Sequence, residues 1–209
     1  MARPRSFDEH QVLSAAGDLF WAKGYDATST RDLVSVTGLS QPSLYNAFGD
    51  KRGLFLRALD HYLDHSLRER ISRLESTQPP ASAITAFFAE IIGRSLSDRQ
   101  HRGCLLVNST LQSTPEDPEL RQAITTELDV IRQFFLRCLT AARQQDALSL
   151  PPGVDIDDAA SQLLAMTLGL RVIARVAPRA GLLVAAVRPA LTSFGLPALD
   201  FPPEFPERR

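Results

Sequence analysis

Cysteine is scarce in this chain of 209 residues: there are two, Cys104 and Cys138, and they form no C-x-x-C pair. Two isolated cysteines do not make a disulfide framework. An excess of charge of one sign is also lacking, because 23 Lys and Arg nearly balance 24 Asp and Glu, for a net charge of −1. Net charge therefore gives no argument for nucleic-acid binding, although the first 57 residues are slightly basic.

Long hydrophobic runs and catalytic patterns are missing too. No stretch reaches the roughly 18 uncharged apolar residues of a membrane-spanning helix, and the charged N-terminus does not resemble a signal peptide. His61 and His65 are four residues apart, but the segment lacks the glutamate of the zinc-protease motif and no third ligand is evident. We therefore expect a cytoplasmic, non-enzymatic protein without metal, cofactor or membrane contact.

Helical periodicity extends along almost the whole sequence. Apolar residues recur at spacings of three and four, and glycine or proline interrupts the pattern at Gly24, Gly38, 79–80 and 151–153. The pattern predicts an all-α protein of about nine helices. They cover about residues 7–23, 29–37, 40–48, 50–76, 82–97, 103–113, 118–142, 156–176 and 180–194.

The segment 27–56, ATSTRDLVSVTGLSQPSLYNAFGDKRGLFL, predicts two short helices joined by a turn at 37–39. A helix-turn-helix presents the exposed face of its second helix to the DNA major groove. Here that face holds small or polar side chains, and the side-chain amides of glutamine and asparagine can pair with adenine. They are Ser40, Gln41, Ser43, Tyr45, Asn46 and Ala47. Thr30, Tyr45 and Lys51 are placed to contact phosphate. The residues alone leave open a three-helix subdomain that binds no DNA.

The run G-L-S-x-x-S-L-Y-x-x-F-x-x-K-x-x-L, from Gly38 to Leu54, resembles the N-terminal domain of the TetR family of bacterial regulators. The preceding T-S-T-R-D-L at 28–33 belongs to the same pattern, and the resemblance covers about residues 7–56. It implies an all-helical homodimer whose three-helix domain binds double-stranded operator DNA, while a C-terminal domain holds an inducer. The implied domains are 1–50 for DNA binding and 51–196 for ligand binding and dimerisation, followed by a proline-rich tail at 197–209.

The resemblance also implies roles for individual residues. The family's phosphate-contacting positions match Thr30, Arg31, Tyr45 and Lys51, and its base-facing positions match Ser40, Gln41, Pro42, Ser43 and Asn46. Ala47 departs from the histidine that is common there, so one contact is expected to be missing. Arg3 and Arg5 form either a basic arm that reaches the DNA or a tail without a specific role.

The rest of the chain has no motif of similar specificity, so a ligand pocket is predicted from chemistry. Such a pocket needs an apolar wall and a few polar groups. On the helices that the family uses, these residues are Phe87, Phe88, Ile91, Leu105, Asn108, Phe134, Phe135, Cys138 and Met166. Because no buried charge is evident among them, we expect a neutral apolar or aromatic inducer that releases a repressor from DNA. Ordinary core packing is the other interpretation.

The last two predicted helices are apolar on more than one face, which indicates that a second chain covers them. We expect a dimer interface that contains Leu163, Leu170, Leu183, Val187 and Leu191. We also expect residues 50–76 to form one stiff helix that carries the ligand signal to the DNA-binding domain.

Cys104 lies in R-G-C-L-L at the predicted start of a helix, beside Arg102. The helix N-terminus and the positive charge of Arg102 both favour a reactive thiolate. The run R-G-C-L-L is also similar to one in a branch of the family that includes sensors of electrophiles and oxidants. An alternative function is therefore a repressor that senses electrophiles or redox state through Cys104. The alternative for Cys104 itself is a small buried side chain with no chemical role. A helical enzyme or carrier with a vestigial helix-turn-helix would need a reactive cluster, and none is visible.

Overall fold

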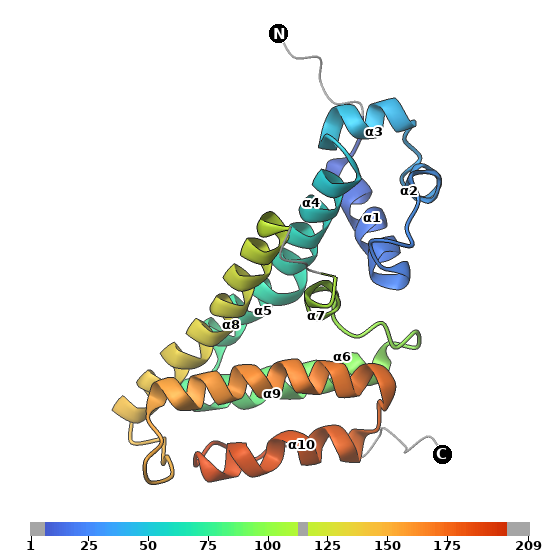
Figure 1. Ribbon diagram of the computed structural model, residues 1–209. Coiled ribbons are helices and arrows are strands. Elements are labelled where there is room, and N and C mark those ends of the chain that lie inside the picture. Colours follow the sequence, from blue (N-terminus) through green and yellow to red (C-terminus); the bar gives the residue numbers. More distant parts are fainter. Residues whose placement is uncertain (1–6, 113–116, 200–209) are drawn as a thin grey trace. The chain divides into compact units, whose positions relative to one another are not determined.

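The computed structural model describes residues 7–112 and 117–199. Within these ranges every regular element is helical and no strand occurs, as expected from the apolar spacing. The elements are α1 Glu9–Lys23, α2 Thr30–Thr37, α3 Gln41–Phe48, α4 Lys51–Leu63, the π-helical turn η1 Asp64–Arg68, α5 Glu69–Thr77, α6 Pro80–Ser97, α7 Leu105–Thr110, α8 Pro118–Gln144, α9 Ile156–Val176 and α10 Ala180–Ser193 (Figure 1). Since α4, η1 and α5 follow one another without a break, the described residues form nine continuous helical segments, in agreement with the expected number.

The chain divides into two compact units. The first, called the head, comprises residues 1–68 and 104–123, and the second, called the body, comprises residues 69–103 and 124–209. This division differs from the boundary expected after residue 50. The reason is that α4 packs along α1, while α7 and the first turn of α8 return to the same unit.

The core of the head forms where α1 packs against α4. Phe20 of α1 meets Phe55 of α4 edge to face, with ring centroids 5.0 Å apart, and Ala16 is completely buried. The helices lie close together at Gly17, where an added Cβ would make an ordinary van der Waals contact of 3.6 Å with the Ala58 carbonyl oxygen. Figure 1 shows α1, α2 and α3 gathered around the first turns of α4. Buried apolar contacts thus fix the frame that carries α2 and α3.

The helical run after residue 50 is not the uniform rod expected from the sequence. It passes through η1, a π-helical turn of five residues, before α5 begins. Arg68, the last residue of this turn, pairs with Asp60 at 2.8 Å and with Asp64 at 2.5 Å. The compact units also divide directly after Arg68. The expectation of one regular helix over residues 50–76 therefore needs correction, because the π turn interrupts the α-helical hydrogen-bonding pattern.

In the body, α6, α9 and α10 pack against one another (Figure 1). An ion pair between Arg137 of α8 and Glu75 of α5, at 2.8 Å, joins two further helices of this unit. By length and composition alone, α9 is apolar enough to cross a membrane, although it contains Arg171 and Arg175 and is not an uncharged stretch. Core helices of soluble proteins pass the same test, and 33% of the most apolar window of α9 is buried within the chain.

Candidate nucleic-acid interface

The start of α2 is fixed by a reciprocal cap. The Ser29 hydroxyl accepts a hydrogen bond from the Asp32 backbone N–H at 3.2 Å, and the Asp32 carboxylate accepts one from the Ser29 N–H at 3.0 Å. Hydrogen bonds from the Ser29 backbone and hydroxyl, together with Lys23, lower the pKa of Asp32 to about 2. Asp32 is therefore ionised near neutral pH, and a carboxylate in the first turn stabilises the helix. Thr30 and Arg31 follow directly in this turn.

The turn between α2 and α3 depends on Gly38. Its backbone is left-handed, with φ 68° and ψ 6°, and its N–H donates to the Val34 carbonyl at 3.1 Å. A residue with a side chain rarely adopts this conformation, so glycine is required at the end of α2. Ser40 then caps α3, and its hydroxyl accepts a hydrogen bond from the Ser43 N–H at 3.3 Å. The chain therefore enters α3 at a defined angle.

Helix α3 has a buried and an exposed face, as expected for the second helix of a helix-turn-helix. Leu44 is completely buried and Phe48 is 7% exposed. The exposed side chains are the predicted base-facing residues Ser40, Gln41, Pro42, Ser43 and Asn46. The Ser40 and Ser43 hydroxyls lie 2.9 Å apart and bond to each other. Gln41 and Asn46 are thus the longest polar side chains that this face offers to a base edge.

The predicted phosphate-binding residues lie on three helices of the head. The Thr30 hydroxyl of α2 and the Tyr45 hydroxyl of α3 are 2.6 Å apart, and Arg31 is exposed beside Thr30. Lys51, at the start of α4, places its Nζ 4.4 Å from the centre of the Tyr25 ring. Its ammonium group also lies 3.5 Å from the Asp26 carbonyl oxygen. The structure thus brings Thr30 and Tyr45 into contact, and Lys51 is held separately.

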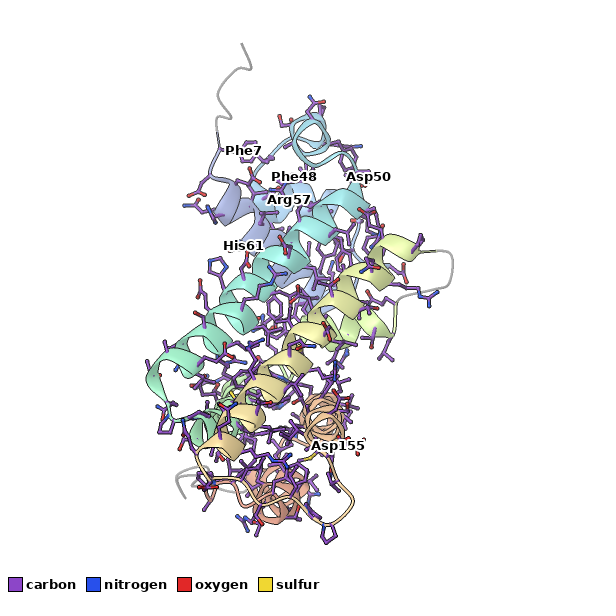
Figure 2. All side chains as sticks on the ribbon, turned by 90° about the vertical axis from the view of Figure 1, so that its left-hand side faces the viewer. Phe7, Phe48, Asp50, Arg57, His61 and Asp155 are labelled. Atoms are coloured by element: carbon purple, nitrogen blue, oxygen red, sulfur yellow. The ribbon has the colours of Figure 1, made fainter. Side chains whose placement is uncertain are left out.

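Gly53 is a residue of this region that the sequence analysis did not single out. A Cβ at this position would lie only 2.2 Å from the carbonyl oxygen of Phe48, the last residue of α3. Only glycine therefore lets the first turn of α4 approach the end of α3 this closely. The signal available in the sequence was a glycine within the first turn of a helix, where most residues are more favourable. Figure 2 shows Phe48 beside Phe7, whose ring centroid lies 6.2 Å away.

Three histidines line up where α1 meets α4. His61 lies between His10 and His65, with ring centroids 5.4 Å and 4.4 Å away, and its Nε2 is 3.0 Å from the Ser14 hydroxyl. Burial, then His65 and His10, lower the pKa of His61, while Asp64 and Asp60 oppose the shift. Figure 2 shows His61 on α4, one turn beyond Arg57. Over 7–112 and 117–199, no three His, Cys, Asp or Glu side chains are arranged to hold a metal ion.

Four of the predicted ligand-binding residues form one aromatic cluster in the body. Phe87 and Phe88 of α6 and Phe134 and Phe135 of α8 are completely buried. The Phe87 ring lies 5.2 Å from Phe134 and 5.3 Å from Phe135, and the Phe88 and Phe135 rings stack at 5.7 Å. The four rings fill the space between their helices.

The other predicted ligand-binding residues are distributed over both units. Ile91 and Cys138 are buried in the body, and Met166 is half-buried there. Leu105 and Asn108 lie on α7 and belong to the head. An open pocket of about 310 Å³ in the body is lined by none of the predicted residues; its lining is Ala81, Asp146, Ala147, Leu148, Ser149, Gly195 and Pro197.

The body contains two buried charged side chains that the sequence analysis missed. Arg70 of α5 and Glu127 of α8 are each 3% exposed. The Arg70 Nε lies 3.2 Å from a carboxylate oxygen of Glu90, which also pairs with Arg73 at 2.7 Å. Neither Arg70 nor Glu127 belongs to the predicted ligand-binding set, so the body holds buried charge outside that set. Arg70 and Glu127 occur where helical periodicity places buried residues, which was the available signal.

The five residues predicted for a dimer interface are part of the chain's own core. Leu163, Leu170, Leu183, Val187 and Leu191 are between 0% and 2% exposed. They leave almost no surface for a second chain to contact, so a partner would have to use other side chains. Helical periodicity identified the apolar positions correctly, but it could not distinguish burial within one chain from burial between two chains.

The two cysteines differ in their surroundings. Cys104 is half-buried at the N-cap of α7, and the Tyr62 hydroxyl is oriented toward its sulfur at 3.9 Å. Cys138 is buried, which raises the pKa of its thiol to about 12, with a smaller contribution from Glu75. Arg102, expected to favour a Cys104 thiolate, pairs with Asp98 at 3.4 Å. Cys104 is thus the more accessible thiol.

Comparisons with known proteins cover both units. The family model described as "Bacterial regulatory proteins, tetR family" matches residues 12–58. The model described as "Tetracyclin repressor-like, C-terminal domain" matches residues 80–188, about half of the chain. The first match contains α2, the turn at Gly38 and α3.

Individual relatives agree with these models. The chain is 32% identical to the uncharacterized HTH-type transcriptional regulator YezE of Bacillus subtilis, over 84% of this chain and 90% of that protein. It is 31% identical to the HTH-type transcriptional repressor ComR of Escherichia coli, over 83% of this chain and 82% of that protein. A cysteine mutant of the TetR family transcriptional regulator CifR, solved with 26-bp double-strand operator DNA, matches with a TM-score of 0.78 and 32% identity, over 92% of this chain and 100% of CifR. This chain therefore belongs to the TetR family and is a DNA-binding transcriptional regulator.

Proposed function

We propose that this protein is a homodimeric repressor that binds a near-palindromic operator through α3 and leaves it when a small ligand binds the body. The observation that carries the proposal is the exposed polar face of α3, with Gln41 and Asn46 free of the helix cap that engages the serines. Repression is proposed by analogy with ComR, a transcriptional repressor, and operator binding by analogy with CifR, which was solved with operator DNA. The site of action is the cytoplasm, where bacterial operator DNA resides.

Selection of DNA duplexes from a random-sequence library tests this proposal. Two heads related by a two-fold axis read two half-sites, so the selected duplexes should share an inverted repeat. Gln41→Ala should relax base preference at one position in each half-site by about 1–3 kcal/mol. Gln144→Ala, on the exposed end of α8, is the control and should select the wild-type sequence. Failure of the wild-type chain to enrich any repeat would refute the proposal.

The exposed apolar face of α9 and α10 supports a homodimer. Val172 is 52% exposed, Val176 is 79% exposed and Leu182 is 37% exposed. Gly169 lies on the same helix, and a Cβ there would have nothing within 4 Å, so another helix could approach closely at this position. A self-complementary apolar face of this kind suits a two-fold dimer.

The aromatic cluster supports a ligand with an aromatic or apolar body. Four adjacent, completely buried phenylalanine rings can rearrange around a planar molecule. A panel of small compounds tests this by thermal shift and by release of the selected duplex. The panel should include anionic as well as neutral compounds, because Arg70 is buried in the same unit. The proposal fails if no compound that raises the melting temperature releases DNA.

A second candidate function is thiol sensing through Cys104, because this thiol is more accessible than Cys138 and lies near the Tyr62 hydroxyl. The Cys104 thiolate would add to the carbon–carbon double bond of N-ethylmaleimide, forming a C–S bond, and the adjacent carbon would take up a proton from water to give the succinimide thioether. Release of the duplex by this reagent should disappear in Cys104→Ser and persist in Cys138→Ser. Release that is unchanged in Cys104→Ser would refute thiol sensing at this position.

A further inference from the structure

Gln112, just after α7, and Asp117, just before α8, both contact residues near the start of α4 or the end of α1. The Gln112 side-chain oxygen accepts a hydrogen bond from the backbone N–H of Tyr25 at 3.3 Å. The Asp117 carboxylate pairs with Arg52 at 2.6 Å, and their side chains are only 28% and 20% exposed. Both contacts lie within the head, and they join residues 87 and 65 positions apart in the sequence.

The two contacts converge on Tyr25, the residue over which Lys51 is held. The Arg52 guanidinium carbon lies 5.8 Å from the Tyr25 ring centre and 5.7 Å from that of Phe55. Lys51 Nζ lies 4.4 Å from the Tyr25 ring centre. Cations are attracted to aromatic faces at such distances. Arg52 is therefore held by two rings and by Asp117, and its position determines that of the adjacent Lys51.

Asp117 also begins α8. The same carboxylate oxygen that pairs with Arg52 accepts a hydrogen bond from the Leu120 backbone N–H at 3.0 Å. Helix α8 has 27 residues without a π turn; it begins in the head and continues into the body after residue 123. The other helical run that leaves the head, α4 to α5, passes through η1 at the division between the units. Of these two runs, α8 is thus the one that keeps regular α-helical hydrogen bonding where it passes from one unit to the other.

We propose that Asp117 is a positioning residue for DNA binding: through Arg52 it holds the first turn of α4, and with it Lys51, in the phosphate-binding position. Because Asp117 caps α8, the position of α8 sets that of the phosphate contact. This inference rests on the proposed function. It adds a route from the body to the DNA that does not pass through η1.

A double-mutant cycle tests the inference with Arg52→Gln, Asp117→Asn and the double variant. Asparagine retains a side-chain oxygen that can cap α8. The operator dissociation constant is measured on a duplex selected by the wild-type chain, and the melting temperature is measured in parallel. The general effect of each charge on DNA affinity is additive, whereas the direct contact produces coupling. We expect coupling of about threefold or more in the dissociation constant, because the ion pair fixes Lys51 in its phosphate-binding position before DNA binds.

The ion pair between Glu9 and Arg57 is the matched control, since Arg57 lies on the same helix α4. Glu9→Gln and Arg57→Gln should show no coupling in operator affinity. Coupling of Arg52 and Asp117 in melting temperature alone, or equal coupling in affinity for both pairs, would show a purely structural role and overturn the inference. A wild-type chain that selects no duplex would overturn the proposed function as well.

Discussion

A glutamate at Val172 is expected to convert the protein into folded monomers that no longer bind the operator. Val172 lies on the exposed face of α9 and is 52% exposed in the single chain. A charge there remains in water as long as the chain is alone, but it would be buried between two copies. Leu183 on α10 is completely buried, so a charge at that position enters the core of the chain itself.

The size of the effect follows from the area involved. Complete burial of a valine is worth about 1.5–3 kcal/mol, so the half-exposed Val172 contributes about 1 kcal/mol per copy and about 2 kcal/mol per dimer. Each copy would also bury one unpaired carboxylate, which costs about 1 kcal/mol per copy and about 2 kcal/mol per dimer. The sum of about 4 kcal/mol raises the dimer dissociation constant roughly a thousandfold.

Sedimentation velocity at micromolar concentration measures the oligomeric state, and circular dichroism measures the folded fraction. Val172→Glu should sediment as a folded monomer, Gln144→Glu should remain dimeric, and Leu183→Glu should lose the folded state. A dimeric Val172→Glu protein would show that the exposed face of α9 is not the interface. Unfolding of Val172→Glu would show that the residue is part of the core.

Three further outcomes are expected. Tyr45→Phe removes one phosphate-binding hydroxyl, so titrations should show that the binding free energy for selected and mixed-sequence duplexes falls alike by about 0.5–1.5 kcal/mol. A loss of affinity confined to the selected duplex would instead indicate a base contact. Gly53→Ala should displace α3 and lower both melting temperature and operator affinity, because its Cβ would lie 2.2 Å from the Phe48 carbonyl oxygen; Gly93→Ala, with nothing within 4 Å, should stabilise the protein. Burial lowers the pKa of His61 below its ordinary 6.5, so as the pH falls the unfolded chain binds the proton before the folded chain does. The free energy of unfolding should therefore decrease as the pH falls below about 6.5, and thermal melts of His61→Gln should show a weaker pH dependence.

The helices and the helix-turn-helix could be predicted because their signals are local. Apolar spacing, the serine caps and Gly38 act within a few residues of the structures that they determine. The exposed face of α3 follows from the same periodicity, since Leu44 and Phe48 define the opposite side.

The features that could not be predicted depend on distant partners. The pairing of Arg52 with Asp117 joins residues 65 positions apart, and nothing near either residue indicates it. Whether Leu183 or Val172 is covered by the same chain depends on the packing of whole helices. The π turn after Leu63 has no proline or glycine to mark it. Such features follow from tertiary packing, which local propensity does not encode.

The π turn has a consequence for the length of the chain. Its hydrogen bonds close over five residues instead of four, so the stretch 64–68 contains about one residue more than a regular α-helix needs. Deleting one exposed residue from this stretch would convert it to regular helix, while Leu63 and Ile71 keep their buried side. Elsewhere in α4 or α5, the same deletion would rotate every following side chain by about 100°. Relatives of this protein should therefore differ in length by one residue at this point more readily than anywhere else along the same run.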